Sequence, residues 1–190
     1  MFVFIRVKSK KRTWLANRRD VKENREGFNK RKAGKKAIRI SEECIVIPFL
    51  FPQHRVYVSF ISALHLYGII EQIPQVMTLA STMHTKIITT KIGTFSVHRI
   101  APSFFDGFVW YKNEGNFLIA EPEKALIDCL YLSAYKRKQF GYFPELHFSS
   151  SFSFKKARMW IKRIPNPKIR LYTQKKLDHI AEDQRRTGIS

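Results

Sequence analysis

Apolar and polar positions divide the chain into a sparse N-terminal stretch and a patterned remainder. Residues 8–39 are mostly Lys, Arg, Asn, Glu and Gly, and their few apolar side chains do not recur at helical spacing for long. We expect this stretch to be disordered, or loosely helical, when no partner is bound. Residues 38–50 then become apolar and β-branched, which predicts a short strand ending near Pro48.

Four later segments have the pattern of helices. Ser59 can cap the first of them with its hydroxyl, and Gly68 suits the left-handed position that follows a helix. Pro122 begins the second, which is apolar on nearly every side and should therefore be buried on most of its surface. Ser153 can cap the third, which has one apolar stripe. The four segments are residues 59–68, 122–135, 154–164 and 169–183.

Between the first two helices the pattern is that of β-strands. Turn signals at residues 92–93 and 113–115 predict two hairpins. We expect an antiparallel sheet of four or five strands in this region. The predicted strands are residues 76–81, 86–90, 94–101, 107–111 and 116–120.

These elements together indicate an α+β fold, in which a mixed or antiparallel sheet of hairpins is packed by helices. Residues 46–190 are expected to form one α/β domain with basic helices at its C-terminal end. Residues 1–45 are expected to be a basic segment, either disordered or a degenerate DNA-binding region. A length of 190 residues fits one ordinary domain with such an appendage.

Charge is distributed unevenly along the chain. It has 35 Lys and Arg against 15 Asp and Glu, which gives a formal net charge of +20. Residues 1–40 carry fifteen cationic and three acidic side chains, residues 41–150 carry nine of each, and residues 151–190 carry eleven and three. A field of this size attracts polyanions, so the expected partner is DNA, or RNA. The alternative is a solvated tail that only aids solubility.

Lys and Arg at both ends are candidate contacts for nucleic-acid phosphates. Such contacts fix the position of a protein on the nucleic acid without reading its sequence. The N-terminal candidates are Lys10, Lys11, Arg12, Arg18, Arg19, Arg31, Lys32, Lys35 and Lys36. The C-terminal candidates are Lys155, Lys156, Arg158, Lys162 and Arg163. A solvated outer helix face explains the second group equally well, and the neighbouring Trp160 is expected to pack instead of stacking on a base.

Catalytic and metal-binding patterns do not emerge from the sequence. The two cysteines and six histidines show no disulfide or zinc spacing, and GxSxG, HExxH and P-loop motifs are missing. Asp106 and Glu123 approach the metal-binding pattern of restriction-type nucleases, but Pro122 favours a helix start over the required strand. We therefore expect no enzyme, metal or cofactor.

The apolar stretch at residues 45–51 is too short to span a bilayer, and a reducing cytoplasm fits the lone cysteines.

Three separated segments carry recognisable motifs. They read YVSFISALHLYG at residues 57–68, followed by EQIPQV, then KIGTFS at residues 91–96 and LIAEPEKALID at residues 118–128. In this order they resemble the effector region of AbiEi-type antitoxins, and the match continues more weakly through residues 154–180. The motif positions, for which we expect structural roles, are Ser59, Ala63, Leu64, Gly68, Pro74, Gly93, Pro122, Glu123, Lys124 and Asp128.

The resemblance implies a regulator in two parts. In this family an N-terminal winged helix binds operator DNA and represses a type IV toxin–antitoxin operon of abortive infection. The following α/β region counteracts a nucleotidyltransferase-like toxin without forming a stable complex with it. Residues 1–45 of this chain lack the three amphipathic helices that a winged helix requires. The sequence therefore predicts an antitoxin-like, DNA-binding transcriptional regulator, and the alternatives are a non-specific nucleic-acid-binding protein or a decayed antitoxin without activity.

Asp128 is the motif residue with the clearest physical requirement. Its neighbours Ile127 and Cys129 indicate burial, and a buried carboxylate without a donor costs several kcal/mol. We expect it to accept a hydrogen bond from a backbone N–H or a hydroxyl in residues 57–62. Lys124 stands four residues earlier and can pair with it on one helix face. Glu123 is interpreted as part of a helix start that suits the helix dipole.

Overall fold

The computed structural model describes residues 3–5, 14–16, 44–111, 117–135, 140, 143 and 145–186. Within residues 8–39, where disorder or a loose helix was expected, the structure describes residues 14–16, and these form a strand. The rest of that stretch and the nine N-terminal candidates for phosphate contact lie outside the described residues. Near the N-terminus, β1 (Val3–Ile5) pairs antiparallel with β2 (Trp14–Ala16).

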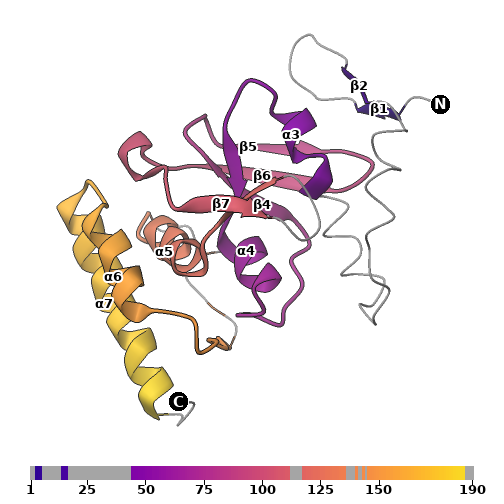
Figure 1. Cartoon of the computed structure of the whole chain (residues 1–190). Helices are drawn as coiled ribbons and strands as arrows, with labels where there is room; N and C mark the ends of the chain where they lie inside the picture. Colours follow the sequence, from indigo (N-terminus) through magenta and orange to yellow (C-terminus); the bar gives the residue numbers. More distant parts are fainter. Residues whose placement is uncertain are drawn as a thin grey trace.

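A six-stranded mixed sheet lies at the centre of the fold (Figure 1). The predicted α+β class is confirmed, as are both hairpins, which are β5–β6 and β7–β8. In spatial order the strands are β5 (Lys86–Thr89), β6 (Thr94–Arg99), β4 (Met77–Ser81), β3 (Val56–Val58), β8 (Phe117–Ala120) and β7 (Phe108–Tyr111).

The expectation of an antiparallel sheet with four or five strands is wrong in two respects. The three-residue strand β3 adds a sixth member, and the pairs β3–β8 and β4–β6 are parallel. Each hairpin places its second strand against the central β3–β4 pair and its first strand at an edge of the sheet. The hairpin signal in the sequence does not specify that placement, so the parallel pairings are set by tertiary packing.

Helices cover the sheet unequally, with α4 and α5 on one side, α3 on the other, and α6 and α7 outside α5 (Figure 1). The helices are α3 (Ile47–Leu50), α4 (Phe60–Leu66), α5 (Pro122–Ser133), α6 (Phe154–Lys162) and α7 (Pro167–Arg186), with the 3₁₀ turn η2 (Pro102–Phe104). The strand predicted for residues 38–50 is wrong where the chain is described. Pro48 lies in the first turn of α3, where its missing N–H removes no helical hydrogen bond.

Helix α5 is the central helix of the fold. Every residue from Glu123 to Ser133 is buried, as predicted from the apolar residues on nearly every side of this helix. It packs against α4, α6 and α7. Within the described part of the chain, no helix has the length and apolar content needed to cross a bilayer.

Of the predicted helix-end residues Ser59, Gly68 and Ser153, two have the expected role. Ser153 Oγ accepts a hydrogen bond from Lys156 N at 3.2 Å, which caps α6. Gly68 follows α4 with a φ of 69°, in the left-handed region. The cap predicted at Ser59 is wrong, because its hydroxyl makes no bond to the first turn of α4 and is used elsewhere.

Candidate functional site

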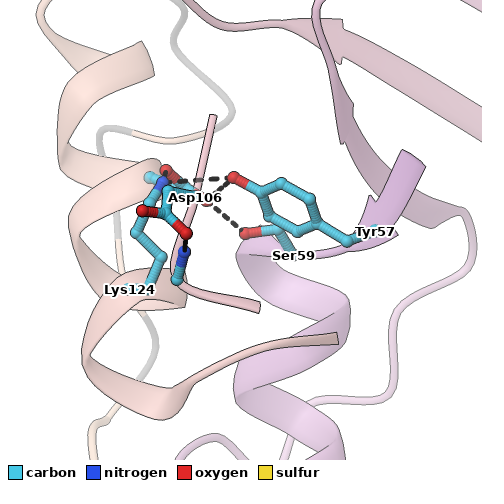
Figure 2. Close-up of polar contacts among 6 residues, drawn as sticks. Tyr57, Ser59, Asp106 and Lys124 are labelled. Atoms are coloured by element: carbon cyan, nitrogen blue, oxygen red, sulfur yellow. Dashed lines mark hydrogen bonds and ion pairs between the residues drawn. The ribbon is translucent and has the colours of Figure 1, made fainter. Parts of the chain in front are cut away.

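Four polar side chains meet where β3 and the start of α4 face α5. Figure 2 labels three of them, Tyr57, Ser59 and Lys124, together with the neighbouring Asp106. Asp128 Oδ2 accepts hydrogen bonds from Ser59 Oγ at 2.7 Å and from Tyr57 Oη at 3.1 Å. Lys124 Nζ donates to Tyr57 Oη at 3.1 Å and forms an ion pair with Asp128 Oδ1. All four side chains are completely buried. We call this group the buried network.

Two local arrangements, far apart in the sequence, place these residues. Tyr57 is the middle residue of β3, and Ser59 stands at the turn from that strand into α4. Lys124 and Asp128 lie one turn apart on α5, so they share a helix face. The predicted pairing with Lys124 is confirmed, and so is the predicted hydrogen bond to Asp128 from a hydroxyl in residues 57–62.

A residue from β4 replaces the missing cap of α4. Thr78 Oγ1 accepts a hydrogen bond from Ser62 N at 3.2 Å and donates to Ser59 O at 2.8 Å. This contact satisfies one of the N–H groups at the helix start and leaves the Ser59 hydroxyl to bond Asp128. The turn is strained, since Phe60 has a φ of 57°, which bulky residues rarely adopt. The buried network and Thr78 hold that turn in place.

Removal from water governs the electrostatics of the buried network. Burial lowers the pKa of the Lys124 ammonium and raises the pKa of the Asp128 carboxyl, and the opposite charge of each partner counteracts both shifts. Burial, and then the Asp128 carboxylate, raise the pKa of Tyr57 well above its ordinary value. Tyr57 therefore keeps the proton that it donates. The Lys124 ammonium also lies over the Phe104 ring, 3.8 Å from its centroid, which adds a cation–π contact.

A second group of contacts closes the network on the α6 side. Asp106 Oδ1 accepts a hydrogen bond from Gly107 N at 2.8 Å, and Asp106 Oδ2 pairs with Arg163 Nη1 at 2.8 Å. These contacts lower the pKa of Asp106, the Gly107 bond most strongly. The Arg163 guanidinium lies over the Trp160 ring at 4.9 Å, and that ring packs on Gly107 and is 5.8 Å from Lys124 Nζ. Trp160 therefore packs, as predicted.

The acidic start of α5 joins that helix to α6. Pro122 is the first residue of α5, which confirms the predicted helix start. Glu123 Oε1 accepts a hydrogen bond from Ser153 N at 3.0 Å. Lys156 Nζ lies 3.0 Å from Glu121 Oε1 and 3.5 Å from Glu123 Oε2. Glu123 thus fixes the first turn of α6 against the first turn of α5.

Other motif positions also have local structural contacts. Ala63 and Leu64 are fully buried in the core on α4. Gly93 lies in the β5–β6 turn, where its N–H donates to Thr90 Oγ1 at 3.1 Å and its carbonyl accepts from Thr90 N at 2.9 Å. Pro74 is half-buried in the segment between α4 and β4. Throughout the described ranges, no three His, Cys, Asp or Glu side chains are grouped so that they could hold a metal ion.

The predicted phosphate contacts on α6 fall into two classes. Lys156, Arg158 and Arg163 are engaged in ion pairs, the second of them with Asp178 at 3.1 Å. Lys155 and Lys162 are exposed and make no salt bridge with the described residues. Only the second pair is therefore available to a ligand without breaking an existing ion pair.

Further exposed cations lie on α7 and were not singled out from the sequence. They are Lys168, Lys175, Lys176, Arg185 and Arg186. The excess of cations over residues 151–190 indicated a basic region. The cations that share one face of α7 can be identified only once the first and last residues of that helix are known. Lys168 and Lys175 are seven residues apart, so they lie on one face about 10 Å from each other along the axis. From the exposed cations without a salt bridge among the described residues we select Lys155, Lys162, Lys168 and Lys175, and we call these four the unpaired lysines.

Comparison with known proteins adds no identification. No protein-family model, curated protein or solved structure matches the chain at a significant level.

Gly107 tests the packing of α6 over the buried network. Its φ is 76°, and an added Cβ would lie 2.5 Å from the Trp160 ring, whereas a Cβ at Gly68, with a φ of 69°, would meet no atom within 4 Å. We expect Gly68→Ala to cost about 1–2 kcal/mol of unfolding free energy through backbone strain alone. Gly107→Ala should cost clearly more, measured by urea denaturation. Equal costs at the two glycines would contradict the packing of Trp160 on Gly107.

Lys124→Met tests the ion pair of the buried network. We expect this variant to lose about 3–5 kcal/mol of unfolding free energy, because it leaves the Asp128 carboxylate buried without a counter-charge. Adding Asp128→Asn removes that charge, so the double variant should be more stable than Lys124→Met alone in urea denaturation. Strictly additive losses would contradict a coupled pair.

The same Lys124→Met variant should have a characteristic pH dependence. Burial raises the pKa of Asp128, and without Lys124 no opposing charge lowers it. The folded state then takes up a proton more readily than the unfolded state, so its stability rises as pH falls through the folded pKa towards the ordinary value of 3.8. The stability deficit of the variant relative to the wild-type chain should shrink over that range.

Proposed function

We propose that this chain is a non-catalytic, antitoxin-like transcriptional regulator of a type IV toxin–antitoxin system. It binds DNA through its basic ends and counteracts a nucleotidyltransferase-like toxin without a required stable complex, cofactor or membrane. A cytoplasmic location fits this role. The observation that carries the proposal is that the polar residues of the PEKALID motif are used inside the protein, for packing.

The three motif segments support this reading because they lie in one packed unit. Residues 57–68 form β3 and α4, residues 91–96 form the β5–β6 turn and the start of β6, and residues 118–128 form β8 and the first half of α5. β3 pairs directly with β8, and β6 belongs to the same sheet, separated from β3 by β4 alone. If these motifs formed a catalytic site, some of their polar groups would face a bound substrate. Here Lys124 and Asp128 are both fully buried and satisfy each other.

Charge on the C-terminal helices supports the nucleic-acid part. The unpaired lysines are exposed, and on α7 they share a face, so a phosphate backbone can approach without disrupting the ion pairs at Lys156, Arg158 and Arg163. The central sheet offers no comparable excess, since residues 41–150 contain nine cationic and nine acidic side chains. The C-terminal helices are therefore the part of the described chain best suited to a polyanion.

A gel-shift titration of the full chain on duplex DNA tests this surface. Replacing the four unpaired lysines with Gln should weaken binding and reduce the slope of log K against log salt by about 0.9 for each phosphate that is no longer neutralised. The matched control replaces four exposed cations around the sheet with Gln, namely Arg55, Lys86, Lys91 and Arg99.

The control variant should retain near wild-type affinity and slope. Equal decreases in the affinity of the two variants would show that only overall charge matters and would contradict the assignment to α6 and α7. Comparing DNA from the gene's own promoter with unrelated DNA of equal length distinguishes a sequence-specific regulator from a non-specific binder.

Co-expression tests the antitoxin role. The chain should restore growth to cells that express a nucleotidyltransferase-like toxin from a neighbouring gene, because residues 46–190 resemble the effector region of the family. The readout is growth after induction, with the toxin alone and the toxin plus the four-Gln variant as comparisons. Failure of the wild-type chain to restore growth would remove the antitoxin role and leave nucleic-acid binding as the remaining function.

A further inference from the structure

The two edges of the sheet differ in how they are protected against pairing with another strand. Edge strand β5 carries the exposed Lys86, a charged residue of the kind that discourages such pairing. Edge strand β7 contains Phe, Val, Trp and Tyr, with no charge and no proline. Val109 and Trp110 in β7 are 45% and 59% exposed, on opposite faces of the strand. The edge strand β5 thus carries a charged side chain beside the exposed Ile87, whereas the edge strand β7 carries no charge.

The backbone of β7 also has unused hydrogen-bonding groups. Glu121 N donates to Gly107 O at 2.9 Å, and the register pairs Val109 with Ile119. In an antiparallel ladder, residues alternate between facing their partner strand and facing away. Gly107, Val109 and Tyr111 therefore face β8, and the N–H and C=O groups of Phe108 and Trp110 face outward. No strand or helix in the described ranges pairs with that outer side.

We propose that β7 pairs antiparallel with β7 of a second copy of this chain, around a two-fold axis at Val109. This register places Phe108 opposite Trp110 of the second copy, so that the outward groups of both strands bond to each other. The strand is uncharged, so two copies meet without like-charge repulsion at the contact. A charged foreign strand would find no counter-charge on β7. The proposal goes beyond the regulator role and does not depend on it.

The small size of the contact sets the expected affinity. One pair of four-residue strands with two exposed apolar side chains on each copy corresponds to the low end of specific interfaces. We therefore expect a reversible dimer with a dissociation constant in the micromolar range. It joins the two sheets edge to edge and leaves the unpaired lysines of both copies exposed.

Charge-swap variants at Val109 test this arrangement by sedimentation velocity across concentrations. Val109 of one copy faces Val109 of the other, so Val109→Lys should place like charges opposite each other and abolish the dimer. Val109→Glu should do the same. An equimolar mixture of the two variants should dimerise again. Ile87→Lys is the matched control, because Ile87 is 70% exposed on the opposite edge strand, and this variant should dimerise like the wild-type chain.

Several outcomes would overturn the proposal. These are a wild-type chain that stays monomeric into the millimolar range, a dimer that Ile87→Lys disrupts and Val109→Lys does not, and a mixture of the Lys and Glu variants that stays monomeric. Circular dichroism of each variant distinguishes loss of pairing from loss of folding. Amide exchange of the wild-type chain gives an independent readout, since the N–H groups of Phe108 and Trp110 should gain protection as concentration rises.

Discussion

The buried ion pair between Lys124 and Asp128 is the constraint on which the rest of this structure depends. Two charges removed from water are tolerated only when every polar atom around them is satisfied, and Tyr57 and Ser59 supply the remaining donors and acceptor. Because those two residues belong to β3 and to the turn into α4, the requirement fixes the position of α5 against the sheet.

The contacts at the start of α4 and around Trp160 follow from that requirement. Ser59 cannot cap α4 while it serves Asp128, so Thr78 of β4 takes over the contact at the helix start. The strained backbone at Phe60 is held between these two sets of bonds. On the outer side, Trp160 covers Gly107 and shields Lys124, and this contact aligns α6 and α7 with α5. The exposed cations of the C-terminal helices are presented on a surface that the buried charges position.

The sequence predicted what depends on local patterns and missed what depends on distant partners. Helix starts at Pro122 and Ser153, the left-handed Gly68 and both hairpins follow from residue type and spacing. The burial of Asp128 and its hydroxyl donors could be predicted because a carboxylate among apolar neighbours has few alternatives. The cap at Ser59 failed because a distant carboxylate competes for its hydroxyl. Paired and unpaired cations of the C-terminal helices could not be separated, since the acids that pair with Lys156, Arg158 and Arg163 lie on other elements of the fold.

Chemical labelling of Lys124 tests most directly whether the buried network serves architecture. An amine-acylating reagent should modify Lys124 only through global unfolding, so the labelling rate of Lys124 should rise with urea with the same denaturant dependence as unfolding. The exposed Lys155 on α6 should react at once and independently of urea. Rapid, urea-independent labelling of Lys124 in the folded chain would show that the network opens to solvent, and would contradict a purely structural role.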